Sequence, residues 1–107
     1  MKKRRVWSQG DLVLIEGMIP EGSQEVIDHD GILLKGEATG HAHRVISGEA
    51  RYFRNGKECY VFALTNLQIG HEDHFGFQRT IPAGISVRYG QEREANWLEE
   101  VTRNVAD

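Results

Sequence analysis

The feature that most limits the fold is the dipeptide Asn55-Gly56, which lies between two runs of strand-forming residues. The runs cover residues 50–54 and 59–64. Because Asn and Gly both tolerate the positive φ of a type I′ turn, the sequence predicts an antiparallel hairpin with these two residues as its turn. Any fold proposed for the chain must accommodate this hairpin.

Further short strands are predicted on both sides of the hairpin, each bounded by Gly, Pro, Asn, Asp or Ser. They cover residues 11–16, 32–34, 39–47, 67–69, 76–81 and 85–89, and residues 18–31 are predicted to be a loop with room for one short strand at 25–27. About seven or eight short strands separated by turns are typical of an all-β barrel or sandwich and argue against a parallel α/β sheet. A small five-stranded barrel is the competing architecture.

The two ends of the chain differ in charge and in expected structure. With 107 residues the chain is expected to form one domain, 1–107. Residues 1–8 are predicted to be a basic arm. Residues 92–107 are predicted to be an acidic, partly helical tail, because Ala95, Leu98 and Val101 recur at the three-residue spacing of a short amphipathic helix.

The composition indicates in which cellular compartment the protein works and whether it enters a membrane. No apolar run approaches the ~20 residues that span a bilayer, and no signal peptide is recognisable. The single cysteine, Cys59, is predicted to be a small core residue in a reducing environment, so we expect a cytoplasmic protein that does not enter a membrane.

The charge distribution allows binding of nucleic acid only through one basic segment of the chain. The net charge of −3 gives no general attraction for phosphates. Four consecutive cations open the chain: Lys2, Lys3, Arg4 and Arg5. One interpretation is a basic arm that contacts phosphates or an acidic partner. The other is a solvated terminus with no binding role.

Four of the five histidines form two close pairs. On a strand, residues two apart point to the same face, so His41 and His43 can direct two imidazoles at one point, as a metal site requires. His71 and His74 are three apart and come together only in a turn or a helix, and Glu72 and Asp73 between them favour a turn. Chance clustering of exposed histidines is the alternative for both pairs.

From Gly36 to Gln91 the sequence resembles the two signature motifs of the cupin family. The order of residues that carries the resemblance is Gly36, His41, His43, Glu49 and Gly56, followed by Gly76, Pro82 and Gly84. The resemblance implies a double-stranded β-helix that pairs into dimers. It also implies a divalent transition metal (Zn, Fe, Mn or Ni) on His41, His43 and Glu49. Val87 stands where cupins have a third histidine, so His71 or His74 is the candidate for the missing ligand.

A second resemblance concerns three short segments: Gly40 to Arg44, His71 to His74, and Gln91 to Glu94. They are similar to segments of a set of small bacterial and phage proteins. This resemblance implies no activity.

Three hypotheses for the function follow. The first is a metal-binding barrel that binds or acts on a small molecule. The second is a metal-independent enzyme that cleaves RNA or processes a nucleotide, with His41 or His43 and His71 or His74 as acid and base, and with Arg44 or Lys35 as the cation. The third is a non-catalytic module that binds a protein, a nucleotide or nucleic acid.

Overall fold

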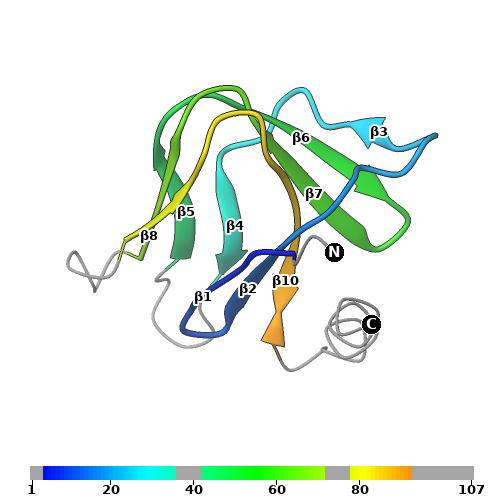
Figure 1. The fold of residues 1–107 in the computed structure, drawn as a ribbon. Helices are drawn as coiled ribbons and strands as arrows, with labels where there is room; N and C mark the ends of the chain where they lie inside the picture. The colour runs from blue at the N-terminus through cyan, green and yellow to red at the C-terminus, as the bar shows by residue number, and fades with distance from the viewer. Residues whose placement is uncertain (1–3, 36–41, 72–77, 93–107) are drawn as a thin grey trace.

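The structure is a computed structural model that describes residues 4–35, 42–71 and 78–92. Within these ranges the chain forms β-strands and no helix, in two antiparallel sheets (Figure 1). The expectation of an all-β barrel or sandwich is therefore confirmed. None of the described residues belongs to a helix that is long and apolar enough to cross a membrane. The helix predicted in the acidic tail lies outside the described residues.

The larger sheet has six strands in the order β1-β2-β10-β7-β6-β3. Their bounds are β1 Val6–Gln9, β2 Leu12–Glu16, β3 Gln24–Glu25, β6 Ala50–Asn55, β7 Glu58–Ala63 and β10 Ser86–Gln91. The smaller sheet has four strands in the order β4-β5-β8-β9. Their bounds are β4 Ile32–Lys35, β5 Ala42–Ser47, β8 Leu67–His71 and β9 Arg79–Ile81.

The core lies between the two sheets and is built from alternate residues of each strand. On β10 and β7, Val87 and Val61 are paired and are 0% exposed. On the facing sheet, Leu67 and Ile69 of β8 are also 0% exposed. Successive strand side chains point to opposite faces, so this alternation defines the face of each sheet that looks inward.

Polar side chains join the two sheets along one edge. Arg79 of β9 donates from Nε to the carbonyl oxygen of Ser8 on β1, at 2.9 Å. Beside it, the amide of Gln9 donates to the carbonyl oxygen of Ile69 on β8, at 3.1 Å. These two bonds connect strands that share no backbone ladder, so β1 is tied to both sheets.

The central hairpin is confirmed, but its turn differs from the prediction. Asn55 pairs with Glu58, so the two loop residues are Gly56 and Lys57. Only Gly56 has a positive φ, of 61°, and the described chain contains no non-glycine residue with positive φ. Glycine at the first loop position is the pattern of a type II′ turn, so the type I′ prediction is wrong. The residue types were right, but the register of the ladder is set by the strands.

The first strand was not anticipated. Residues 1–8 were predicted to be an arm, whereas β1 begins at Val6. Only one residue of this strand, Gln9, is fully buried, and its neighbour Trp7 packs partly against the core. A four-residue edge strand with so little apolar alternation leaves a weak signal in the sequence.

We expect the core to depend on Leu67 far more than on Leu64, although both are leucines on the same stretch of chain. Leu67 is 0% exposed and Leu64 is 47% exposed. Leu67→Ala should lower the free energy of unfolding by about 2–5 kcal/mol, because it leaves a cavity in the core. Leu64→Ala should lower it by less than ~1 kcal/mol. Urea unfolding measures both, and equal losses would contradict the assignment of the core.

Candidate functional site

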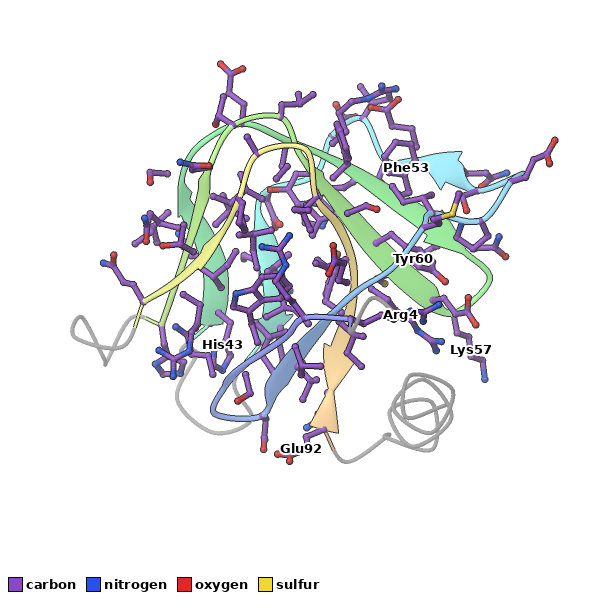
Figure 2. The ribbon with its side chains drawn as sticks, in the orientation of Figure 1. Arg4, His43, Phe53, Lys57, Tyr60 and Glu92 are labelled. Carbon is purple, nitrogen blue, oxygen red and sulfur yellow. The ribbon has the colours of Figure 1, made fainter. Side chains whose placement is uncertain are left out.

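Two of the predicted site histidines meet across neighbouring strands. His43 of β5 pairs with His71 of β8, and their ring centroids lie 4.5 Å apart at an interplanar angle of 62°. His43 shares the inward face of β5 with Val45, so its ring enters the space between the sheets and is only 6% exposed. Figure 2 shows His43 at one end of β5. The structure therefore brings together one member of each histidine pair.

The side chain of Gln9 fixes the tautomer of His43. Because its Nε2 donates to the carbonyl of Ile69, its Oε1 faces His43, where it lies 2.8 Å from Nδ1. An amide oxygen only accepts, so Nδ1 of His43 must carry a proton and donate it. In the neutral ring the lone pair is then on Nε2. A histidine that ligates a metal is held in the same way by a hydrogen bond from its other nitrogen.

The turn between β1 and β2 passes close to the other edge of the His43 ring. Gly10, with φ of 56°, is the residue of this turn that faces the ring. A Cβ at Gly10 would lie 3.3 Å from Cε1 and 3.5 Å from Nε2 of His43. The turn therefore packs closely against this edge of the ring, and a side chain at position 10 would crowd Cε1 of His43.

Glu49 does not lie with His43. It is exposed and follows the far end of β5, and the strand from His43 to Ser47 alone spans about 13 Å. Glu49 instead lines an open pocket with Asp30 and Tyr52. Two residues this far apart cannot bind one ion, so the described geometry does not assemble the ligand set implied by the cupin resemblance.

Arg44 also lies away from the histidine pair. It follows His43 directly on β5, so its side chain leaves from the opposite face of the strand. Lys35, the other candidate cation, follows Leu34, which pairs with His43, so its side chain also leaves from the opposite face. Neither candidate cation is thus presented on the face of His43 and His71, and metal-independent cleavage of RNA stays a hypothesis.

His41 and His74 lie outside the described residues. β5 begins at Ala42 and β8 ends at His71, and these two ends are at the same end of the sheet. His41 is therefore one residue from the described strand, and His74 lies at most about 10 Å of extended chain from His71. Among the described residues alone, no group of three His, Cys, Asp or Glu is arranged to hold a metal.

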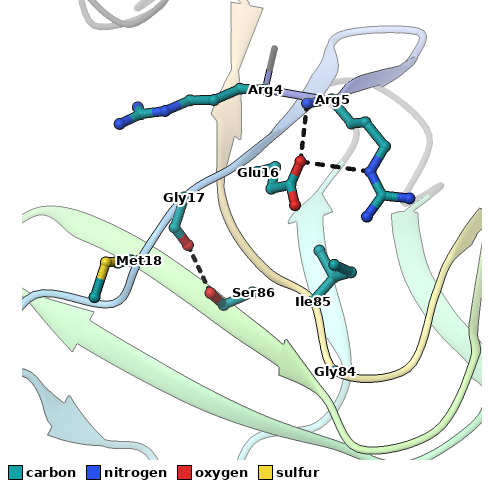
Figure 3. A pocket seen from close by; sticks show the side chains of 8 residues that line it. All are labelled: Arg4, Arg5, Glu16, Gly17, Met18, Gly84, Ile85 and Ser86. Atoms are coloured by element: carbon teal, nitrogen blue, oxygen red, sulfur yellow. Dashed lines mark hydrogen bonds and ion pairs between the residues drawn. The ribbon is translucent and has the colours of Figure 1, made fainter. Parts of the chain in front are cut away.

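The basic arm is partly engaged by the fold. The backbone N–H and the Nε of Arg5 both donate to Oε1 of Glu16, at 3.1 and 3.4 Å, and its guanidinium lies 5.7 Å from the Trp7 ring centroid. Arg4 points away from this contact (Figure 3), and both arginines line an open pocket of about 720 Å³ with Met18 and Ser86. Lys2 and Lys3 lie outside the described residues, so the structure places two of the four cations, Arg4 and Arg5, at this pocket.

His29 is a second histidine centre, which the sequence pattern hardly indicates. It is the single histidine outside the two pairs and lies in an acidic, turn-rich segment. Its ring stacks on Tyr52 with centroids 3.7 Å apart and an interplanar angle of 2°. The N–H of Gly31 donates to Nδ1 at 2.9 Å, and Nε2 lies 3.4 Å from the hydroxyl of Tyr89. A histidine two residues before a turn glycine was the only available signal.

Comparison with known proteins identifies one family. The family described as Domain of unknown function (DUF8820) matches residues 8–87. No curated protein and no solved structure is significantly similar to the chain. The matched range includes His43, His71, Gln9 and His29, so both histidine centres lie within the family domain.

We expect Gln9→Leu to destabilise the protein and to release the tautomer of His43. The change leaves the Ile69 carbonyl and the His43 Nδ1–H without their partner, at a cost of about 1–3 kcal/mol for each group. Nitrogen-15 NMR of the imidazoles should show the proton moving from Nδ1 toward Nε2. Gln68→Leu is the control, because the Gln68 Oε1 accepts a hydrogen bond from the hydroxyl of Thr80 at an exposed position. An unchanged tautomer in Gln9→Leu would contradict the role of Gln9.

Because of His29, the free energy of unfolding should decrease as the pH is lowered. Burial lowers its pKa from the usual 6.5, and the nearby carboxylate of Asp30 only partly opposes this shift. Below pH 6.5 the unfolded chain therefore binds more protons at this residue than the native chain, and stability decreases until the native pKa is passed. Urea unfolding between pH 7.5 and 5 should show a smaller decrease for His29→Asn. Equal slopes for the two proteins would refute this assignment.

Proposed function

The chain belongs to the DUF8820 domain family, and we propose from the geometry of its histidines that it binds a divalent transition metal through His43 and His71. The observation that supports this most directly is the hydrogen bond from His43 Nδ1 to Gln9, which places the lone pair of the neutral ring on Nε2, the nitrogen that would bind the ion. The partner imidazole lies on the adjacent strand, with the ring centroids 4.5 Å apart. These residues fit a metal in their chemistry and in their fixed orientation.

The proposal keeps the metal implied by the resemblance to cupins but changes the ligand set. His41 and His74 are the proposed further ligands, since both are close in the chain to the described pair. Glu49 is omitted because about 13 Å of strand separates His43 from Ser47, before Glu49 is reached. An all-imidazole set is a good ligand set for zinc, nickel, copper and iron.

Binding of a small molecule at the metal is the function that we propose for this site. A transition metal there would supply a Lewis acid for an oxygen-bearing small molecule. The protein's contribution is to hold the imidazoles: Gln9 fixes the ring of His43, and the antiparallel ladder fixes His71 opposite it. With Cys59 as the only cysteine, we propose a reducing, cytoplasmic setting.

Metal binding by His43 and His71 should be measurable on the chelator-treated protein. Titration with Co²⁺, Ni²⁺ or Zn²⁺ in a calorimeter should show one ion per chain, and a thermal melt should shift upward and return after chelation. His43→Ala and His71→Ala should each weaken binding by at least about 100-fold, because losing a ligand costs more than losing its outer partner.

A variant of Glu49 distinguishes the proposed histidine ligands from the ligand set that the cupin resemblance implies. Glu49→Gln should leave the affinity unchanged if the histidines hold the ion, and should weaken it strongly if the cupin set is correct. Binding that survives both alanine changes, or no binding by the unaltered protein, would remove the proposal.

A further inference from the structure

A small pocket at the other end of the molecule from His43 combines hydrogen-bond donors with apolar walls. Its volume is about 130 Å³, and it lies between the segment that follows β3 and strands β6, β7 and β10. Its lining residues are Val26, His29, Phe53, Arg54, Cys59 and Tyr89. Figure 2 shows Phe53 beside β3, far from His43. This pocket is therefore separate from the proposed metal site.

The first donor is His29, whose tautomer is fixed by the backbone. Because the Gly31 N–H donates to Nδ1, the lone pair of the neutral ring is on Nδ1 and the hydrogen is on Nε2. The stack on Tyr52 holds the ring plane. Nε2 lies 3.4 Å from the Tyr89 oxygen, longer than the 2.7–3.2 Å of a good hydrogen bond. The Nε2–H is thus pre-oriented and can take a better acceptor.

The second and third donors are Tyr89 and Arg54. Burial raises the pKa of Tyr89 well above 10, so its hydroxyl keeps its hydrogen. Arg54 lies opposite Cys59 on β7, and Cys59 lies opposite Tyr89 on β10, so the three side chains leave from the same face of the sheet. Arg54 is exposed at the pocket, and no described side chain forms an ion pair with it. No Asp or Glu lines the pocket, so its net charge is positive.

The apolar lining of the pocket favours an organic carboxylate over inorganic phosphate. Val26 gives the pocket an apolar side-chain wall, which inorganic phosphate does not match and a short hydrocarbon chain does. Phe53 precedes Arg54 on β6, so its ring leaves from the other face of the sheet. The volume resembles that of a cavity of roughly 150 Å³ that accepts benzene, so the occupant has about six heavy atoms. We propose that this pocket binds a small organic monocarboxylate, with the carboxylate on His29, Tyr89 and Arg54 and the hydrocarbon part against Val26.

Calorimetry with three probes of similar size tests the proposal on the full chain. Butyrate should bind, butylammonium should not, and inorganic phosphate should bind at least ten-fold more weakly than butyrate. Cys59 is the only cysteine and lines the pocket, so saturating butyrate should also slow its alkylation by iodoacetamide at least five-fold. Equal or tighter binding of phosphate, or no binding of butyrate, overturns the proposal.

Matched variants assign the binding to these residues. Arg54→Gln should weaken butyrate at least ten-fold, whereas Arg51→Gln on the same strand should not, because Arg51 is paired with Glu25 outside the pocket. His29→Asn keeps an acceptor for the Gly31 N–H but removes the Nε2–H, and should weaken butyrate at least five-fold. If His29→Asn does not fold, the comparison of butyrate affinity between Arg54→Gln and Arg51→Gln tests the proposal by itself. Equal weakening by the two arginine variants would mean a general charge effect and would overturn the proposal.

Discussion

The six-stranded sheet depends on β10, which lies between β2 and β7 and forms a backbone ladder with each of them. Residues 86–91 thereby connect the start of the chain to the central hairpin. Without β10 the sheet would separate into β1-β2 and β7-β6-β3. The same strand carries Val87 into the core and places Tyr89 opposite Cys59. Core and pocket are therefore consequences of one long-range pairing.

Local chemistry explains which parts of this fold are predictable from sequence. The hairpin of β6 and β7 was predictable, because it depends on a turn residue and on neighbouring strand formers. Its turn was shifted by one residue, because the pairing of Asn55 with Glu58 is a property of the whole ladder. β1 was not predictable, because Gln9 is buried for its hydrogen bonds across the sheets and not for apolar character. A buried glutamine gives no hydrophobic pattern.

The candidate sites divide in the same way. The pairs of histidines drew attention to His43 and His71, but their contact depends on the register of β5 against β8. Glu49 was predicted as a ligand from the spacing of a family motif. The number of residues between Glu49 and His43 does not give the distance between their side chains in space. His29 has no distinctive neighbour in sequence. Its partners, Tyr52 and Tyr89, are 23 and 60 residues away, and its third contact is a backbone N–H that no sequence pattern reports.

The two histidine centres show how one side chain acquires two opposite roles. His43 faces an amide oxygen and so holds a hydrogen on Nδ1, leaving a lone pair on Nε2. His29 faces a backbone N–H and so holds its lone pair on Nδ1, leaving a hydrogen on Nε2. The first ring is prepared to donate electrons and the second to donate a hydrogen bond. One neighbouring atom decides between them in each case.

The position of β10 in the chain also has a consequence for biosynthesis. β2 is almost entirely buried in the finished sheet, with Leu12 to Ile15 at most 3% exposed, and one of its two neighbours emerges from the ribosome roughly 70 residues later. At about 5–20 residues per second, this strand waits on the order of 4–14 s with one edge and an apolar face uncovered. An unpaired apolar strand edge is the surface from which chains aggregate. The growing chain should therefore be most vulnerable, and most in need of chaperone protection, in the interval before β10 is complete.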